Sequence, residues 1–335
     1  MKITLVGAGA IGSLLGIKLV QSGHVVSFIV MERQVKTIQQ QGLTLIMKSG
    51  SKLHIDEVIA VANPSDLGPQ ELIILAVKAH QLLNVAPNLE PLMDSKTAVM
   101  TVQNGLPWWY FENHGGPFDG HQLLSLDPTG AIRNAIDKSR VIGCVAYPAA
   151  TLIEPAVAKH VEGDRFTIGE LDGTQSERCQ QIACALIGAG FKSYVIEDIR
   201  SEIWLKAWGA LSFNPISALT HATMEDICRL PETRQLVREM MQEAQTVANK
   251  LGIQFRHTIE KRIDGAEKVG PHKTSMLQDI ERGNSLEIEA VIGSILELAE
   301  LTNTATPVIK SIYACCKLLN KTITENGNKI VALTR

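Results

Sequence analysis

Three glycines near the start of the chain could bind the phosphates of a dinucleotide. Gly7, Gly9 and Gly12 form the pattern G-x-G-x-x-G directly after the apolar run at residues 3–6, and a helical pattern follows them. The first glycine allows a tight turn, the second lets backbone N–H groups approach a pyrophosphate, and the third lets helix and strand pack closely. The same three glycines could instead form a tight turn that needs glycine only for packing and binds no ligand. The position between a buried strand and a helix favours a dinucleotide site.

The end of the second strand-like run is the place that distinguishes NAD from NADP. Residues 24–30 read HVVSFIV, and Met31, Glu32 and Arg33 follow them. An acidic side chain at this point favours the ribose hydroxyl of NAD, whereas an arginine accommodates the 2′-phosphate of NADP. Glu32 and Arg33 offer both, and an exposed helix start would carry the same residues. These residues alone therefore leave the preference open.

Polar residues follow two further apolar runs. Lys78 comes directly after residues 71–77, ELIILAV, and Asn104-Gly105 ends the run TAVMTVQNG at 97–105. In an open α/β sheet, ligands bind beyond the carboxyl ends of the strands. Lys78 could therefore bind a phosphate or a carboxylate. Asn104-Gly105 could line the same edge, or it could be only a turn.

A lysine stands within an apolar helical stretch in the second half of the chain. Residues 204–220 read WLKAWGALSFNPISALT, with Lys206 eight residues before Asn214. Positions eight apart lie two turns apart on one helix face, so both side chains would project to the same side. A single lysine on a half-buried helix usually extends its ammonium group into water, and that is the alternative interpretation of Lys206.

A second polar group precedes another helical stretch. Residues 272–290 read HKTSMLQDIERGNSLEIEA, and an amphipathic helix is expected from about residue 285. Taken alone, Ser275 could be a helix cap and the carboxylates could simply be solvated. Beside Lys206, the same residues could complete a polar site. The acidic candidates within this segment are Asp279, Glu287 and Glu289.

Strand-like and helical runs alternate through the first 197 residues. Short apolar runs are typical of strands buried in a parallel sheet, and their alternation with helices indicates a doubly wound α/β fold. The pattern breaks over residues 106–129, which are rich in glycine, proline and aromatic residues and predict a long ordered loop. The expected strands lie at 3–6, 24–30, 43–47, 53–61, 71–77, 97–105, 140–148, 157–161, 165–170 and 192–197, and the expected helices at 10–22, 32–41, 80–92 and 176–189.

After residue 197 the sequence shows helical periodicity alone. Residues 233–252 and 287–303 are amphipathic, with apolar side chains at i, i+3, i+4 and i+7, and Pro307 is placed to begin a further helix. The polar end, residues 320–335, is expected to fray. The sequence therefore predicts an α/β protein in which an N-terminal Rossmann-type doubly wound sheet, the dinucleotide-binding domain at 1–197, is followed by an all-α substrate and catalytic domain at 198–335.

Composition narrows the functional classes. The chain has 335 residues, of which 45% are hydrophobic, and its formal net charge of −3 offers no basic excess for binding nucleic acid. Six scattered cysteines without a C-x-x-C pair, and no histidine cluster at zinc spacing, favour reduced thiols in a cytoplasmic protein and no metal site. The N-terminal residues are all used by the strand, turn and helix, so no signal peptide is expected. No apolar run reaches the ~18 residues that span a membrane.

Five segments together resemble the ketopantoate reductases (2-dehydropantoate 2-reductases). The resemblance spans residues 1 to about 320, and five motifs in register are far more specific than any one of them. The segments are MKITLVGAGAIGSLLG at the N-terminus, AVKAHQ at 76–81, VQNG at 102–105, the block with IWLKAW and FNPISALT at 203–220, and the block with SMLQDIERG and EIEA at 275–290.

The resemblance implies a fold, a reaction and residue roles. Members of this family fold as a Rossmann domain followed by an all-helical domain, with the active site in the cleft between them. They reduce the ketone of ketopantoate to D-pantoate with NADPH, on the route to pantothenate and coenzyme A. Carried over residue by residue, the resemblance makes Lys206 the catalytic general acid and Glu287 the catalytic glutamate that balances its charge.

The remaining matched positions are assigned to ligands. The resemblance places substrate carboxylate or hydroxyl groups on Asn104, Asn214 and Ser275. The implied partner is a small 2-oxoacid, no nucleic-acid or membrane partner is expected, and apolar faces on the C-terminal helices make a homodimer reasonable. The implied cofactor-binding positions are the loop of Gly7, Ala8, Gly9, Ala10, Ile11 and Gly12, together with Arg33, Lys78, Asn104 and Ala150.

Two positions depart from the family pattern. Many members carry an asparagine four residues after the catalytic lysine, where this chain has Ala210, and one substrate hydrogen bond worth about 0.5–1.5 kcal/mol is then missing. The family's usual arginine after the second strand matches Met31, and Arg33 could substitute for it. Ketopantoate reduction with NADP is the first hypothesis. A reductase of another branched 2-oxo or 3-hydroxy acid and a non-catalytic NADP-binding sensor are the alternatives.

Overall fold

The chain forms two compact units in the computed structural model, which describes residues 1–325. Unit 1 comprises residues 1–103, 108–122 and 127–199, and unit 2 comprises residues 104–107, 123–126 and those from 200 onward. The end of the predicted strand at 97–105 and two pieces of the predicted loop, residues 106–107 and 123–126, therefore belong to unit 2, which no sequence pattern indicated. Of the tail expected to fray, residues 320–325 belong to the last helix and residues 326–335 lie outside the described residues.

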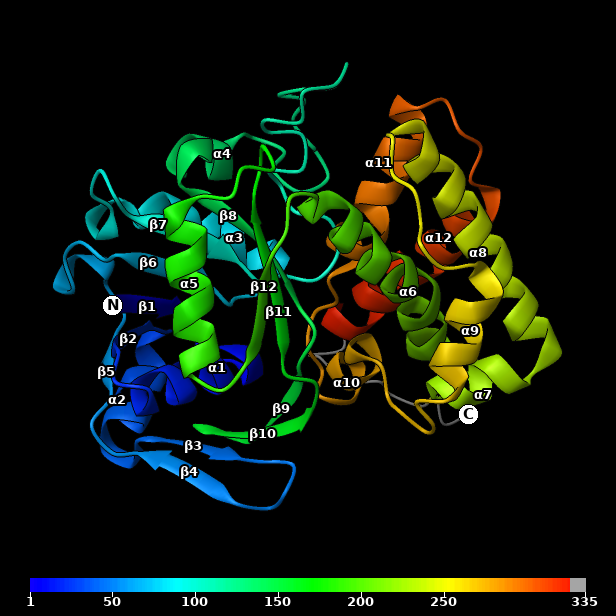
Figure 1. The fold of residues 1–335 in the computed structure, drawn as a ribbon. Helices are drawn as coiled ribbons and strands as arrows, with labels where there is room; N and C mark the ends of the chain where they lie inside the picture. The colour runs from blue at the N-terminus through cyan, green and yellow to red at the C-terminus, as the bar shows by residue number, and fades with distance from the viewer. Residues whose placement is uncertain (326–335) are drawn as a thin grey trace. The chain divides into compact units, whose positions relative to one another are not determined.

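Unit 1 contains strands and helices, whereas unit 2 is helical (Figure 1). The strands are β1 (Lys2–Val6), β2 (Val25–Ile29), β3 (Leu43–Ile46), β4 (Lys52–Ile55), β5 (Ile59–Val61), β6 (Leu72–Leu75), β7 (Ala98–Thr101), β8 (Val141–Ala146), β9 (Ala149–Glu154), β10 (Val157–Glu162), β11 (Arg165–Glu170) and β12 (Lys192–Val195). The helices are α1 (Ala10–Gln21), α2 (Glu32–Gln41), α3 (Leu82–Val85), α4 (Ala131–Ala135), α5 (Glu177–Gly188), α6 (Ile199–Thr220), α7 (Met224–Arg229), α8 (Pro231–Lys250), α9 (Ile259–Glu267), α10 (Ser275–Glu281), α11 (Ser294–Leu301) and α12 (Pro307–Glu325).

Eight strands of unit 1 form one sheet in the order β12-β11-β8-β7-β6-β1-β2-β5. The strands from β8 to β5 run parallel, whereas β11 pairs antiparallel with β8. β1 lies between β2 and β6, with Val6 level with Ile29 and Leu75. Every residue of β6 and β7 is buried, as expected for the centre of a parallel sheet. The structure confirms the predicted α/β class with an N-terminal Rossmann-type sheet and a helical C-terminal region.

A second sheet, of order β4-β3-β10-β9, packs against α1. It corrects one prediction, because residues 53–61 do not form a single strand: β4 belongs to this sheet and β5 to the large one. Asp56 and Glu57 between the two strands are exposed, and such charged residues are unfavourable inside a sheet. Helix α1, which carries the glycine motif, therefore contacts strands of both sheets.

The helix expected over residues 80–92 is not formed. The chain instead makes the single α-helical turn α3 with short 3-10 turns around it. Pro87 and Pro91 stand in these turns, and each lacks a backbone N–H and would clash with the preceding helical turn. Lys78 is consequently followed by short turns rather than by the start of a long helix.

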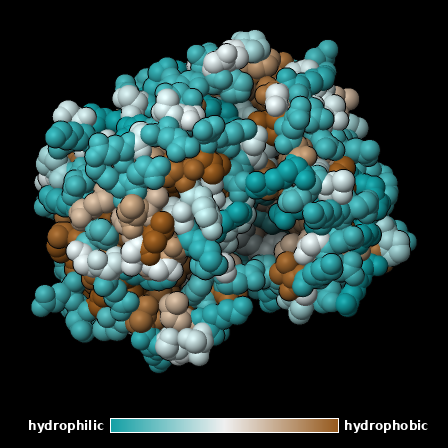
Figure 2. All heavy atoms as spheres, viewed as in Figure 1, coloured by the Kyte–Doolittle hydropathy of each residue, from teal (hydrophilic) through white to brown (hydrophobic). Residues whose placement is uncertain are grey.

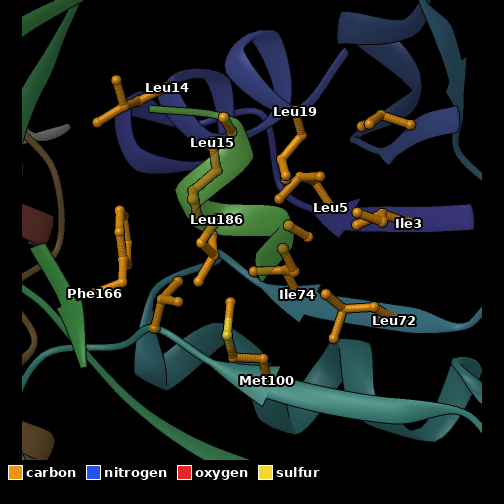
Figure 3. Close-up of a cluster of buried hydrophobic side chains, with 14 of the residues drawn as sticks. Ile3, Leu5, Leu14, Leu15, Leu19, Leu72, Ile74, Met100, Phe166 and Leu186 are labelled. Atoms are coloured by element: carbon orange, nitrogen blue, oxygen red, sulfur yellow. The ribbon is translucent and has the colours of Figure 1, made fainter. Parts of the chain in front are cut away.

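The core of unit 1 lies between the large sheet and helices α1 and α5. Leu15 from α1 and Leu186 from α5 point toward strand residues such as Ile74, and all three are buried (Figure 3). Burial of apolar surface on this scale is the main stabilising contribution to the unit. It also holds α1 at a fixed height above β1 and β2, which sets the geometry of the glycine turn between β1 and α1.

Gly16→Ala is expected to lower the free energy of unfolding by about 1–3 kcal/mol. A Cβ at Gly16 would lie under 3.0 Å from the fully buried ring of Phe28 on β2, so helix or ring must shift. The matched control is Gly188→Ala in α5, where no atom lies within 4 Å of the new Cβ and alanine should stabilise the helix by up to about 1 kcal/mol. Urea unfolding followed by circular dichroism measures both. Equal effects at the two positions would contradict this account of the packing.

Unit 2 confirms two helices that the sequence predicted. Helix α12 begins at Pro307, and the Glu243 carboxylate of α8 accepts the N–H groups of Val308 and Ile309 at 3.0 and 2.9 Å. Because the first N–H groups of a helix have no partner within it, this carboxylate joins α8 to α12. Helix α8 shows the expected amphipathic spacing and buries Val237, Met240, Met241, Ala244, Val247 and Ala248.

The helix expected from about residue 285 begins three residues later, at Ile288. The Leu286 N–H donates to Asn320 Oδ1 at 2.9 Å, which holds the preceding residues outside the helix. The first turn is π-helical, over Glu289–Gly293, and is called η6 here; α11 continues from it. This rare turn begins two residues after the candidate Glu287.

All six cysteines are free thiols. Burial raises the pKa of the Cys179 and Cys228 thiols to about 11 each and that of Cys316 to about 12. Such thiols stay neutral at ordinary pH and pack as small apolar side chains. Cys144 is buried as well, whereas Cys184 and Cys315 are exposed.

The face of the molecule in Figure 2 is mostly hydrophilic, with scattered hydrophobic side chains. Within residues 1–325, no helix combines the length and the apolar character that crossing a bilayer requires. In the same part of the chain, no three or more His, Cys, Asp or Glu side chains are grouped to hold a metal ion. The groups that could carry function are therefore those of the glycine turn and the polar side chains near α6.

Candidate functional site

The glycine motif of unit 1 forms the turn between β1 and α1. Gly7 has a φ of +105°, which favours glycine, and its N–H donates to Ile29 O at 2.8 Å. Gly9 directly precedes the helix, which begins at Ala10, and no atom lies within 4 Å of the place of a Cβ on Gly9. A Cβ on Gly12 would come under 3.0 Å from the Gly7 carbonyl oxygen. The first and third glycines therefore shape the turn, while the second leaves its outer surface open.

The N-terminus of α1 can bind an anion. No side chain caps this helix, so a side chain does not occupy the N–H groups of its first turn. Ala8 is buried, and Ala10 and Ile11 are half-buried in the turn. The Ser13 hydroxyl donates to Ala8 O at 3.2 Å and fixes the loop from behind. Backbone N–H groups and the helix dipole together favour a phosphate at this point, and these residues fit a dinucleotide.

Lys78 follows β6, and its backbone is held in a short turn. Its N–H donates to Gln81 Oε1 at 3.0 Å, and its carbonyl accepts the Gln81 N–H at 2.9 Å. Gln103, after β7, donates its side-chain amide to Leu75 O at 2.6 Å and to Val77 O at 3.1 Å. Gln103 thus fixes the strand end from which the half-buried Lys78 projects. Sequence reasoning missed Gln103, whose one signal was its place at the end of an apolar run.

Two further cofactor candidates lie elsewhere in unit 1. Arg33 stands in the first turn of α2, next to the exposed Glu32, and its guanidinium Nη2 lies 3.7 Å from Met31 Sδ. Its side chain therefore reaches back to the position that Met31 occupies. Ala150 lies on β9, level with His160 on β10, and is half-buried against the core of unit 1. Strand β9 packs against α1.

Helix α6 has a half-buried strip on an otherwise buried surface. The Trp208 indole N–H donates to Met241 O of α8 at 2.8 Å, and this bond fixes the rotation of α6 about its axis. Lys206, Ala210 and Asn214 are half-buried, while all six residues between them are buried. Because a spacing of four keeps residues on one helix face, these three positions form the strip.

The Lys206 ammonium donates a hydrogen bond to Asn104 Oδ1 at 2.7 Å. The two residues are 102 apart in the sequence, and both belong to unit 2. A hydrogen bond from a charged donor is shorter and stronger than one between neutral groups. Lys206 therefore does more than extend into water, and Asn104 is more than a turn residue.

Asn214 and Ser275 form a second pair within unit 2, in which Asn214 Nδ2 donates to Ser275 Oγ at 3.3 Å. Ser275 is the first residue of α10, but the preceding Thr274 caps the helix by accepting the Leu277 N–H. The interpretation of Ser275 as a cap is therefore wrong. The structure thus joins the four candidates in two pairs, one at each end of the strip on α6.

Glu287 and Glu289 differ in their surroundings. Glu289 accepts hydrogen bonds from the Tyr313 hydroxyl at 3.1 and 3.0 Å and from Lys317 Nζ at 2.6 Å. Glu287 is half-buried two residues before η6 begins, and its carbonyl accepts the Val291 N–H at 3.1 Å. Glu289 therefore ties η6 to α12, and Glu287 stays the candidate for a catalytic carboxylate.

One helical segment of unit 2 holds both short loop pieces. The Ala290 carbonyl accepts the Leu106 N–H at 2.9 Å, and the Glu297 carboxylate accepts the N–H groups of Leu124 and Ser125 at 2.7 and 2.9 Å. Sequence reasoning missed these contacts, because the donors in all of them are backbone N–H groups, which carry no signal in the sequence. They place residues 104–107 and 123–126 firmly on η6 and α11.

The two units offer different chemistry. The glycine turn of unit 1 presents backbone N–H groups that suit the phosphates of a dinucleotide. Unit 2 presents an ammonium group with an amide acceptor, an amide paired with a hydroxyl, and a carboxylate. Such a set can bind a small polar molecule, stabilise negative charge on an oxygen atom and donate a proton to it.

Comparisons of the sequence with known proteins converge on one family. The family model described as Ketopantoate reductase PanE/ApbA matches residues 3–114, and the model described as Ketopantoate reductase PanE/ApbA C terminal matches residues 198–320. A 2-dehydropantoate 2-reductase of Mesorhizobium japonicum is 45% identical over 320 residues, which cover 95% of this chain and 98% of the relative.

Solved structures share the fold. A crystal structure from Ralstonia solanacearum MolK2, provisionally named a ketopantoate reductase, has a TM-score of 0.91 and 33% identity over 96% of this chain and 98% of its own. The ternary structure of D-mandelate dehydrogenase with NADH and anilino(oxo)acetate has a TM-score of 0.83 over 97% of this chain and 99% of its own. At 22% identity, the second likeness shows the fold alone.

Proposed function

Because the chain belongs to the ketopantoate reductase family of nicotinamide-dependent oxidoreductases, we propose that it reduces 2-dehydropantoate to D-pantoate. The substrate is a small 2-oxoacid, and the product is the corresponding 2-hydroxy acid. D-Pantoate would serve the synthesis of pantothenate and coenzyme A.

The hydrogen bond from Lys206 Nζ to Asn104 Oδ1 carries this proposal. A nicotinamide held by unit 1 would supply the hydride for the ketone carbon, which would leave negative charge on the ketone oxygen. The Lys206 ammonium stabilises that charge and donates a proton to the oxygen, which completes the alcohol. Asn104 holds one N–H of the ammonium and so directs the others toward the substrate. The neutral amine afterwards regains a proton from water.

The other polar residues of unit 2 complete the proposed site. Glu287 balances the charge of Lys206, because an ammonium group that is removed from water without a partner of opposite charge has a high desolvation free energy. The Asn214 amide and the Ser275 hydroxyl bind the carboxylate or hydroxyl groups of the substrate, together with Asn104. Ala210, between Lys206 and Asn214 on the same strip, offers only a methyl group.

The cofactor that we propose is NADP. Residues 7–12 bind its pyrophosphate through backbone N–H groups at the start of α1. Arg33 takes the place of the arginine that the family usually has at the position of Met31, and it binds the 2′-phosphate. Lys78, Asn104 and Ala150 make further contacts with the cofactor.

Arg33→Ala is expected to lower kcat/KM with NADPH by about 10- to 100-fold and to leave kcat/KM with NADH nearly unchanged. The reason is the loss of a charge-assisted hydrogen bond to the 2′-phosphate, worth roughly 1.5–3 kcal/mol. Lys36→Ala is the matched control, since it removes an exposed positive charge one turn further along α2. Steady-state kinetics with both cofactors measure the effect. A loss shared by NADH, or by the Lys36 variant, would contradict the role of Arg33.

Oxidation of NADPH in the presence of 2-dehydropantoate and other branched 2-oxoacids tests the proposed reaction. We expect the highest kcat/KM with 2-dehydropantoate. A higher value with another acid would favour a paralogous reductase, which Ala210 supports because it removes one substrate hydrogen bond. Binding of NADPH without turnover of any acid would favour a non-catalytic NADP-binding sensor.

Two further proposals concern compartment and assembly. We propose a cytoplasmic location, because the chain keeps six free thiols, which suits a reducing compartment. We also propose a homodimer, on the apolar faces of the C-terminal helices. Fractionation of cells tests the first proposal, and sedimentation equilibrium tests the second. No nucleic-acid or membrane partner is proposed.

A further inference from the structure

The loop segment that carries Asn104 lies directly on the π-helical turn η6. Its Leu106 N–H donates to Ala290 O at 2.9 Å, and both residues belong to unit 2. Gly105 has a φ of +81°, and a Cβ there would lie under 3.0 Å from the Ala290 carbonyl and from Val291 N. Loop backbone therefore contacts helix backbone, with no room for a side chain between them.

The π-helical turn makes this contact possible. In a regular α-helix, the carbonyl of Ala290 would accept the N–H of Ser294, four residues later. The Ser294 N–H is instead bonded to Glu289 O, five residues earlier. Ala290 O accepts the Leu106 N–H and, at 3.0 Å, the Ser294 hydroxyl. Turns of this kind are rare within helices and are frequent at functional sites.

Side chains on α12 keep η6 in place. The Glu289 carboxylate, bonded to Tyr313 and Lys317, lies over Gly293, where a Cβ would come under 3.0 Å from Glu289 Oε2. Glu287 stands two residues before Glu289. One turn of helix therefore determines both where Glu287 stands before the helix and where the loop with Asn104 is seated.

We propose that Gly105 is a positioning residue, whose seat on Ala290 fixes Asn104 Oδ1 as the acceptor for the Lys206 ammonium. The inference rests on the proposed function, because that function makes Lys206 the proton donor. Gly105 has no side chain that could bind substrate, so it acts through its neighbour Asn104. Because misplacing a reacting group by about 1 Å can cost roughly 100-fold in rate, a small displacement of this loop is enough to matter.

A double-mutant cycle of Gly105→Ala and Asn104→Ala tests the proposal, with kcat at saturating NADPH and 2-oxoacid as the readout. Gly105→Ala alone is expected to lower kcat by about 100-fold. In the Asn104→Ala background the same change should cost less than about threefold, because its effect passes through Asn104. Losses that multiply in the double variant would overturn the proposal.

Gly115→Ala is the matched control. Gly115 has a φ of +70°, so alanine there meets the same backbone penalty, but no atom lies within 4 Å of the new Cβ. Its kcat should stay close to that of the wild type. Loss of the acceptor lowers the pKa of the donating ammonium, so the basic limb of the kcat–pH profile should move to lower pH in the Gly105 and Asn104 variants alone. An unmoved limb, or a shift in the Gly115 variant, counts against the proposal.

Two measurements remain decisive if the Gly105 variant does not fold or if no 2-oxoacid is turned over. Amide hydrogen exchange in the wild type should show protection of the Leu106 N–H, and fast exchange there would overturn the seat on Ala290. The 13Cε resonance of Lys206 should differ between the wild type and a folded Gly105→Ala variant. Identical resonances would refute the positioning role, whereas absent turnover with distinct resonances would refute only the proposed function.

Discussion

Lys206→Ala is expected to lower kcat by about 10²- to 10⁴-fold while the Kd for NADPH stays nearly unchanged. The ammonium is bonded to Asn104 at 2.7 Å, so its donors are oriented before any substrate binds. The ammonium stabilises the reacting oxygen more strongly as the ketone becomes an alkoxide. Removing the ammonium therefore slows the chemical step and leaves cofactor binding unchanged. Steady-state kinetics and fluorescence titration with NADPH measure the two effects separately.

The control for Lys206→Ala is Lys310→Ala, which removes the same charge from an exposed position on α12. Its kcat should equal that of the wild type. Small primary ammonium ions should partly restore the Lys206 variant, because they can occupy the vacated volume and donate a proton. A Lys206 variant that keeps more than about a tenth of wild-type kcat would show that this lysine is not the general acid.

Gly9→Ala is expected to raise the Kd for NADPH by about 100-fold, or roughly 2.7 kcal/mol, with little change in stability. The backbone of Gly9, at φ −70° and ψ −171°, is accessible to alanine, and no atom lies near the new Cβ. Reduced freedom of the unfolded chain offsets the weaker preference of alanine for this helix-cap position, so the free energy of unfolding should change by less than about 1 kcal/mol. The methyl group would instead occupy the space that we assign to the pyrophosphate.

Gly12→Ala is the matched comparison for Gly9→Ala, because the added methyl group is the same. Its Cβ would come under 3.0 Å from the Gly7 carbonyl oxygen, so this variant should lose stability as well as cofactor affinity. Thermal unfolding and NADPH titration of both variants separate the two roles. Unchanged NADPH affinity in Gly9→Ala would place the cofactor away from this turn.

Much of unit 1 could be predicted because its signals are local. An apolar run followed by three spaced glycines specifies a strand, a turn and a helix within a few residues. The failures concern choices that tertiary structure makes. Residues 53–61 read as one strand, but β4 and β5 pair in different sheets, and no local pattern encodes that partner. At residues 80–92 the sequence predicts a helix, but Pro87 and Pro91 prevent a continuous one.

The candidate site of unit 2 could be predicted as residues but not as contacts. Nothing periodic links Lys206 to Asn104 across 102 residues, and the family resemblance alone placed both in one site. Glu287 and Glu289 are the same residue type two positions apart, so the sequence does not distinguish them. The structure does, because Tyr313 and Lys317 bind Glu289. The seat of Gly105 on Ala290 depends on a change in helix type, which side-chain patterns do not record.

The path of the backbone limits how this protein can be divided or recombined. The chain passes from one unit to the other after residues 103, 107, 122, 126 and 199. A fragment that begins at residue 200 would keep the Ala290 carbonyl and the Glu297 carboxylate but lose the N–H groups that they accept, at a cost of about 0.5–1.5 kcal/mol for the neutral hydrogen bond and roughly 1.5–3 kcal/mol for each bond to the charged carboxylate. The helical half is therefore not an interchangeable module. A chimera that takes its helices from a relative must also take residues 104–107 and 123–126 from the same parent.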